Sequence, residues 1–244
     1  MPELQTILQN KDRLILQAQE QLTQFLFEQG NKFSNDLARI IGSGNFTQAD
    51  IIQELTRLGY DDAVTTAMEN WGKVIDLSRE ASGAMGINFL LTEQNEANLI
   101  EFLQQKQRFI QLGIKERIAN DMYDFAIGAR MGQRPVAQIK SEAAILLENQ
   151  FRRVGTEVET ALTAFDRAVD QAVFENVGIE RFVYFPGTLI ETSRESCTRI
   201  VNDPRQQTGW TREEIDAEPD VDFVLGGWPF WNCRHRWIPF DVDV

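Results

Sequence analysis

The first forty residues carry an apolar position every three or four residues, with glutamine, asparagine and charged residues between them. This spacing places the apolar side chains on one face of a helix and predicts a single amphipathic helix over residues 3–41. The glycines in Gly42-Ser43-Gly44 are expected to end it. The apolar positions are Leu4, Leu8, Ile15, Leu22, Leu26, Phe33, Leu37 and Ile40.

The helical pattern continues in four further segments, at 48–58, 61–81, 93–131 and 136–176. Thr47 and Thr92 precede two of them and are suitable N-caps, since a threonine hydroxyl accepts a hydrogen bond from the first turn. Gly113 and Gly128 lie inside the third segment without ending it, because an interior glycine costs only about 1 kcal/mol. The apolar stripes of these segments predict an antiparallel helical bundle.

The pattern changes after residue 178. Residues 179–185 form a β-prone run that stops at a Pro-Gly pair. A helix of about ten residues is expected from Thr192, and the sequence after Thr211 has the signature of a capping box. Residues 219–244 are rich in aromatics, proline and glycine, and indicate short strands and loops.

These elements predict an α+β protein. A long, mainly helical N-terminal region is expected over residues 1–178, as a bundle or an extended helical region. A small α+β C-terminal module with short strands is expected over residues 179–244. At 244 residues, both parts are large enough to bury a core of their own.

Composition removes several classes of protein from consideration. The formal net charge of −13 argues against broad adhesion to nucleic acid or to an anionic membrane surface, and no specific nucleic-acid site is evident. No run of 18 or more apolar residues exists, so no membrane span is predicted. The first residues lack a basic start followed by an apolar stretch, so no secretory signal is expected.

Candidate chemistry is concentrated in the C-terminal module, which holds both cysteines and the only histidine. Three interpretations of Cys197, Cys233 and His235 stay open. They could supply three zinc ligands, with Glu191 or Asp222 as a fourth. A cysteine and the histidine could form a nucleophile–base pair. Alternatively, the two cysteines meet as a structural thiol contact or a disulfide, which is the interpretation we favour.

Basic and aromatic residues surround these positions. Strand alternation places Arg234 and Arg236 on one face, and His235 and Trp237 on the other. Together with Arg194 and Arg199, these arginines are expected to form buried or half-buried ion pairs with Glu191, Glu195, Asp241 or Asp243, although Arg–Trp stacking on bases is an alternative. The expected aromatic core of the module includes Tyr184, Trp228, Trp231 and Trp237.

The N-terminal helix has more apolar surface than a single helix–helix seam requires. Phe25, Leu26, Phe27 and Phe33 crowd into two turns. Packing inside the bundle is the simpler explanation, and packing of part of this surface on a partner chain is the alternative.

The C-terminal motifs resemble those of phage Mu F-like head morphogenesis (minor capsid) proteins. The likeness covers about residues 180–240 and consists of separated elements in the same order. One departure is that the first segment has a single cysteine where many members have two, which weakens the metal interpretation. A second is that Glu191 stands near the position of the family's usual aspartate. The elements are Phe182-Val-Tyr-Phe-Pro-Gly187, Glu191-Thr-Ser-Arg194-Glu-Ser-Cys197, Gly226-Gly227 and Asn232-Cys233-Arg234-His235-Arg236-Trp237-Ile238-Pro239.

The resemblance implies a structural protein and no enzyme. The expected partners of such a protein are the portal or capsid protein of a tailed phage, and it is also expected to form a homo-oligomer. It would be made in the host cytoplasm and located in the virion, at the prohead or neck, without a cofactor. A head–tail connector or adaptor ring is the first alternative, and a zinc- or cysteine-dependent enzyme is the second.

Overall fold

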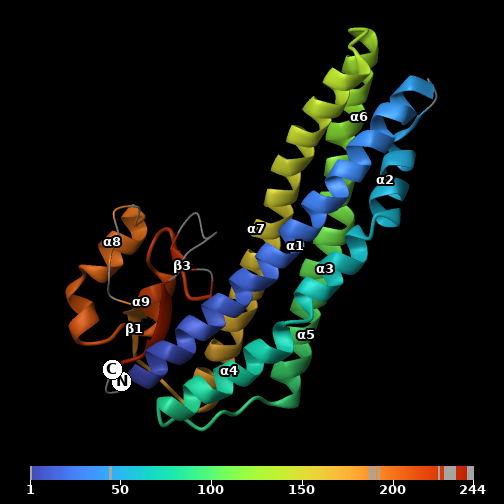
Figure 1. Cartoon of the computed structure of the whole chain (residues 1–244). Coiled ribbons are helices and arrows are strands. Elements are labelled where there is room, and N and C mark those ends of the chain that lie inside the picture. Colours follow the sequence, from blue (N-terminus) through green and yellow to red (C-terminus); the bar gives the residue numbers. More distant parts are fainter. Residues whose placement is uncertain are drawn as a thin grey trace. The chain divides into compact units, whose positions relative to one another are not determined.

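The structure, a computed structural model, describes residues 2–43, 46–186, 189, 191, 193–224, 226–227 and 235–240, and for residues 2, 38, 41–43, 226 and 227 it describes the backbone alone. The larger helices are α1 (Pro2–Ser43), α2 (Gln48–Arg57), α3 (Tyr60–Met68), α4 (Trp71–Ala84), α5 (Glu93–Arg108), α6 (Lys115–Met131) and α7 (Val136–Asn176) (Figure 1). The smaller elements are the π-helix η1 (Phe109–Ile114), β1 (Phe182–Phe185), α8 (Glu195–Val201), the 3₁₀-helix η2 (Pro204–Gln207), α9 (Arg212–Asp216), β2 (Val221–Asp222), β3 (Gly226–Gly227) and β4 (Arg236–Pro239). The predicted α+β class is confirmed.

Local signals in the sequence set most helix ends. The Thr47 hydroxyl accepts from the Asp50 amide at 3.3 Å, and the Asp50 carboxylate accepts from the Thr47 amide at 2.7 Å, so α2 begins with a capping box. The same reciprocal arrangement joins Thr211 and Glu214 at the start of α9. The two long predicted helices at 3–41 and 136–176 correspond to α1 and α7.

Two predicted helices differ from the structure. The single helix expected over 61–81 is two helices, because the chain makes a tight turn at Glu69 and Asn70, with ψ angles of −12° and −8°. The ten-residue helix expected from Thr192 is only the seven residues of α8, because Arg194 is extended (ψ 154°) and acts as the N-cap.

The contacts divide the chain into two compact units, and α1, α5 and α7 each contribute residues to both. The mixed unit consists of Met1–Ile15, Asn70–Leu103 and Thr160–Val244, and the helical unit of Leu16–Glu69 and Gln104–Glu159. The turn between α3 and α4 therefore falls at a change of unit. The expected domain boundary near residue 178 marks the end of α7, whereas the packing division of α7 lies near residue 160.

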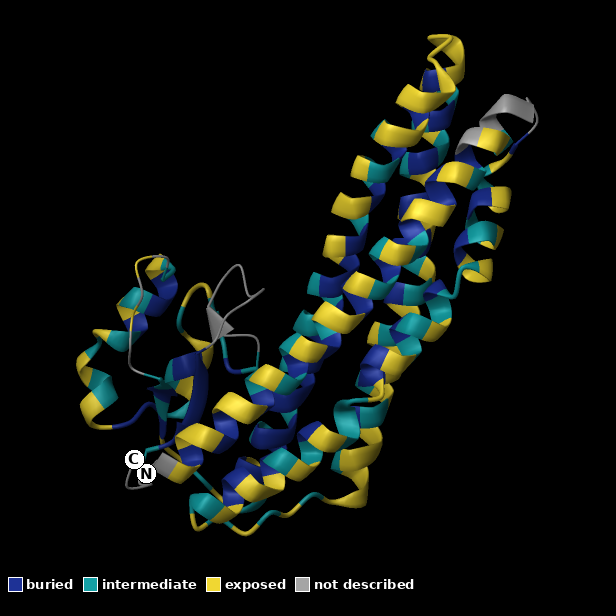
Figure 2. Ribbon diagram, viewed as in Figure 1, coloured by how far each residue is buried: buried dark blue, intermediate teal, exposed yellow. Residues whose placement is uncertain are grey.

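In the helical unit, α1 packs against α7 and α2 packs against α6. The buried residues form stripes along the facing sides of these helices, and the exposed residues lie on their outer sides (Figure 2). Leu26, Phe33 and Leu37 of α1 are at most 2% exposed, so this part of its apolar surface is used within the chain. The stripe is therefore core, as amphipathic spacing requires.

The helix of α5 and α6 is continuous through the π-helical segment η1, which contains Gly113. The wider π turn is held from one side by α3. There the Tyr60 hydroxyl donates to the Ile110 carbonyl at 3.0 Å, and the buried Lys115 ammonium pairs with the Asp61 carboxylate at 2.7 Å. Gly113 therefore does not end the helix, as expected.

The described residues of the mixed unit form two small antiparallel sheets, β1–β4 and β2–β3. In the first, Tyr184 lies opposite Trp237 and Phe185 lies opposite Arg236. The main core of the mixed unit combines the end of α7 with β1, α8, α9 and β4. The buried residues of this core are Val173, Phe174, Phe182, Tyr184, Cys197, Ile200, Trp210, Ile215, Phe223 and Trp237. In the described ranges, no helix is long and apolar enough to cross a membrane.

The close approach of α1 and α7 predicts opposite effects of two glycine-to-alanine substitutions. A Cβ at Gly155 would lie 3.0 Å from the Gln19 side-chain nitrogen and nearer still to the Thr23 hydroxyl. Gly155→Ala should therefore lower the free energy of unfolding by about 1–3 kcal/mol, despite alanine's higher helix propensity. A Cβ at Gly128 would have no atom within 4 Å, so Gly128→Ala should raise the free energy of unfolding by about 0.5–1 kcal/mol. Urea unfolding measures both changes in the free energy of unfolding. Two changes of the same sign would contradict the close packing of α1 on α7 at Gly155.

Candidate functional site

The candidate site is built on the paired strands β1 and β4. Their sequences, Phe182-Val-Tyr-Phe and Arg236-Trp-Ile-Pro, consist of the aromatic and β-branched types that favour strands. Side chains alternate between the faces, so Tyr184 and Trp237 share one face while Phe185 and Arg236 share the other. Residues 235–239 are all buried, so both faces of the pair are covered.

The first face is centred on the Tyr184 ring. His235 stacks on this ring at 4.9 Å with an interplanar angle of 10°, and the Trp237 ring lies 4.8 Å away at 48°. The Tyr184 hydroxyl lies 3.7 Å from the sulfur of Cys197, which α8 contributes. Cys197 and His235 therefore contact the same tyrosine, and their side chains are only 3% and 8% exposed.

Of the other predicted site residues, the structure describes Arg194 and leaves four outside the described ranges. Cys233, Arg234, Trp228 and Trp231 lie outside the described residues, so the proposed contact of the two cysteines stays a prediction. Arg194 is the half-buried N-cap residue of α8, and its carbonyl accepts from the Thr198 amide and hydroxyl. Among the described residues, no group of three or more His, Cys, Asp or Glu side chains is arranged to hold a metal ion.

The second face carries a buried guanidinium. Arg236 is 3% exposed, and it donates to the Asp166 carboxylate at 2.8 Å and to the Asp12 carboxylate at 2.6 Å. A third carboxylate, that of Asp170, lies 3.7 Å from it. Arg236 was expected to pair with Glu191, Glu195, Asp241 or Asp243, of which the last two lie outside the described residues. Its described partners are instead Asp12, Asp166 and Asp170, because the buried face of β4 meets α1 and α7. Arg199 likewise pairs with Glu218.

A buried lysine completes this ionic cluster, which we define as Lys11, Asp12, Ser78, Asp166, Asp170 and Arg236. The Lys11 ammonium pairs with Asp166, donates to both oxygens of Asp170 at 3.1 Å, and donates to the Ser78 hydroxyl at 2.9 Å. Lys11 and Asp166 are fully buried. Burial without such partners would cost several kcal/mol for each charge, so each member depends on the others.

The position in the cluster decides how each carboxyl group titrates. Burial alone would raise the pKa of Asp166, but Lys11 and Arg236 outweigh burial and hold the pKa below its ordinary value. Burial raises the pKa of Asp170, and the Asp166 carboxylate adds to the effect against the opposing Lys11. Burial also raises the pKa of Asp12. Because three carboxylates surround Arg236, its pKa is raised despite burial, and it stays charged.

Sequence reasoning missed every member of the cluster except Arg236, although a local signal existed. Lys11 occupies the position between Leu8 and Ile15 where the stripe of α1 calls for an apolar residue. Asp166 and Asp170 interrupt the stripe of α7 in the same way. A charge at a stripe position indicates a buried partner, but the sequence does not say which partner.

The arrangement is suited to structural work. The thiol of Cys197 faces a phenol, and the imidazole of His235 is stacked flat on the same ring. The ionic cluster is paired internally and closed to water at Lys11 and Asp166. The contacts of the ionic cluster join α1, α4 and α7 to β4.

Comparisons of the chain with protein-family models, with curated proteins and with solved structures found no match. The fold and the site therefore define the class only as a mainly helical α+β protein, whose C-terminal strands are tied to its helices by a buried ionic cluster.

Removing the guanidinium should strongly destabilise the protein. Arg236→Met keeps the length and apolar stem of the side chain, but it leaves the Asp166 and Asp12 carboxylates without this cation. The free energy of unfolding should fall by about 3–5 kcal/mol, measured by urea unfolding at pH 7. Arg39→Gln, which removes the exposed pair with Asp36, is the matched control and should stay within about 0.5 kcal/mol. Equal decreases in the free energy of unfolding of the two variants would contradict the stabilising role of the ionic cluster.

Two neighbouring carboxylates should show opposite pH dependence. Since the folded-state pKa of Asp166 is lowered, its stabilisation is complete above the ordinary value near 3.8 and is lost as the pH falls through the lowered value. The cost of Asp166→Asn should therefore grow as the pH rises. The raised pKa of Asp170 means that ionisation disfavours folding above about pH 4, so the cost of Asp170→Asn should shrink. Unfolding free energies from pH 3 to 7 check this, and parallel profiles would refute it.

Proposed function

We propose that the protein is a structural head-morphogenesis (minor capsid) protein of a tailed phage, acting at the portal or the capsid interior during head assembly. The observation that carries the proposal is the pairing of β1 with β4, with Cys197 and His235 both against Tyr184. The resemblance to Mu F-like proteins requires these separated motif stretches to form one module, and the contacts fit that requirement.

Burial of the motif side chains supports a structural role. Cys197, His235 and Arg236 are at most 8% exposed, and each contacts another side chain of the chain itself. A catalytic group needs access to a substrate, whereas a framework residue needs close packing. The motif therefore serves to fix the module, and recognition of portal or capsid subunits is left to the exposed helical surfaces.

Sedimentation tests the proposal. The full chain is co-expressed with the portal and major capsid proteins encoded by the same phage or prophage, and the products are separated on a sucrose gradient. We expect the chain to sediment with portal-containing proheads, and to stay at the top of the gradient when the portal and capsid proteins are both omitted.

A chain that stays at the top in the presence of assembled proheads, and that is also absent from virions, would refute the proposal. Native mass measurement of the chain alone distinguishes the ring alternative, because a connector would form a stable closed oligomer. A minor capsid protein would instead follow the proheads without forming such a ring.

A further inference from the structure

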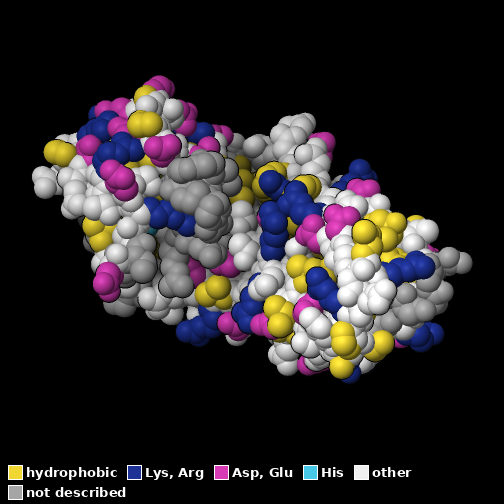
Figure 3. Space-filling view, turned by 90° about the horizontal axis from the view of Figure 1, so that it is seen from above, with side chains coloured by type: hydrophobic (Ala, Val, Ile, Leu, Met, Phe, Trp, Pro, Cys, Tyr) yellow, Lys and Arg dark blue, Asp and Glu magenta, His cyan; other side chains and the backbone are white. Residues whose placement is uncertain are grey.

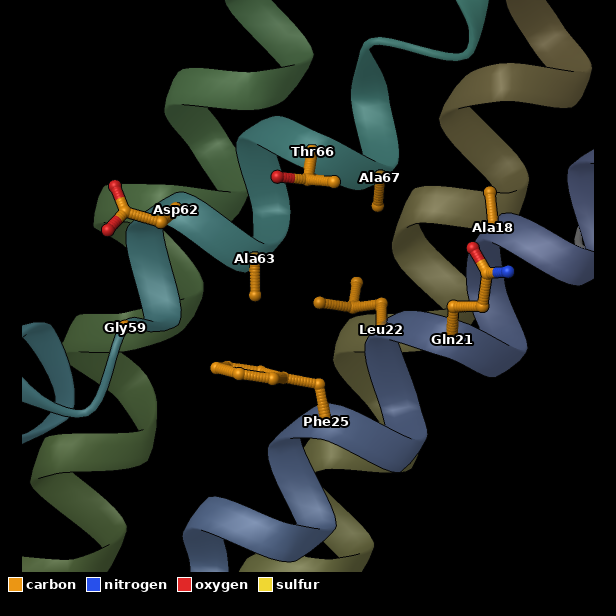
Figure 4. Close-up of a pocket in the computed structure, with 9 residues that line it drawn as sticks. All are labelled: Ala18, Gln21, Leu22, Phe25, Gly59, Asp62, Ala63, Thr66 and Ala67. Carbon is orange, nitrogen blue, oxygen red and sulfur yellow. The ribbon is translucent and has the colours of Figure 1, made fainter.

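The helical unit contains an open pocket of about 300 Å³ between α1 and α3 (Figure 4). This volume lies at the lower end of the range for ligand sites and matches one or two side chains rather than a large cofactor. The lining residues are Ala18, Gln21, Leu22, Phe25, Gly59, Asp62, Ala63, Thr66 and Ala67.

The walls of the pocket are mainly apolar. Leu22 and Phe25 of α1 face Ala63 of α3 across it (Figure 4). The Phe25 ring lies against Gly59, because a Cβ there would be 3.3 Å from the end of the ring. Gly59 has φ +85°, a conformation that other residues adopt with strain, so this close approach is built into the backbone. Small side chains on α3 leave the remaining space unfilled.

The rim of the pocket carries an exposed carboxylate. Asp62 is exposed at one edge, and no cation in the described part of the chain lies within ion-pair distance of it. Its neighbour Asp61 is different, since it is paired with Lys115 at 2.7 Å. Acidic and basic side chains are interspersed on the face shown in Figure 3, although the chain as a whole carries −13. The pocket therefore has an exposed carboxylate at its rim and mainly apolar walls.

We propose that this pocket is a docking site for a basic amphipathic segment of a partner protein. An apolar side chain of leucine, methionine or phenylalanine size enters between Leu22, Phe25 and Ala63, and a lysine or arginine of the same segment lies opposite Asp62. Amphipathic helices dock by placing apolar anchors in a hydrophobic site, and complementary charges beside the site fix their register. The inference goes beyond the proposed function and does not depend on it, because it concerns only the chemistry of this pocket.

Fluorescence anisotropy tests the proposal with the full chain and a labelled 14-residue helical peptide of leucine and lysine. We expect saturable binding that the leucine–glutamate counterpart does not show. Asp62→Asn should weaken binding about three- to fivefold, the range for an exposed ion pair. Ala63→Leu places a larger side chain in the pocket and should weaken binding at least tenfold, roughly the effect of losing one buried apolar anchor.

A matched control separates docking from general attraction to an acidic protein. Asp124→Asn removes an exposed carboxylate of α6 that does not line the pocket, and it should leave the affinity unchanged. Equal weakening by Asp62→Asn and Asp124→Asn would overturn the proposal, as would undiminished binding to a folded Ala63→Leu variant. If circular dichroism shows that Ala63→Leu does not fold, the comparison of the two exposed aspartates still decides, because neither substitution touches the core.

Discussion

The mixed unit depends on a set of charges that have been removed from water. Lys11, Asp166 and Arg236 are at most 3% exposed, and none of them would be tolerated there alone. Their partners come from α1, α4, α7 and β4, which lie far apart in the sequence. The cluster is therefore complete only when all four elements are in place. A partial assembly would leave a buried charge without its counter-charge. An apolar seam would tolerate sliding, whereas paired charges require one arrangement.

The strand pair β1–β4 connects this ionic cluster to the aromatic core. Because side chains alternate along a strand, Arg236 and Trp237 point to opposite faces although they are neighbours in the chain. One face closes the ionic cluster, and the other packs on Tyr184 and the core around α8. Two-sided burial thus explains the alternation of basic and aromatic residues at His235, Arg236 and Trp237, whose side chains are all directed inward.

The sequence predicts much of the fold because most helix signals are local. The stripes of α1 and α7 and the capping box at Thr47 set boundaries to within a few residues. The turn after Glu69 was missed, since neither glycine nor proline marks it and its residues keep near-helical dihedral angles. The alternation of His235, Arg236 and Trp237 followed from the strand period alone. The acid partners of Arg236 could not be predicted, because Asp12 precedes it by 224 residues and nothing in the sequence links such distant positions.

The π-helical segment has a consequence for the residues that follow it. Its hydrogen bonds close a wider turn than those of an α-helix, so one additional residue is accommodated between Phe109 and Ile114. If the same residues wound as an ordinary α-helix, all of α6 would turn by about 100° about its axis. Ile118 and Met122, which are fully enclosed, would then face solvent. The phase of a seventeen-residue helix is thus set by one surplus position, which the Tyr60 hydroxyl keeps in place.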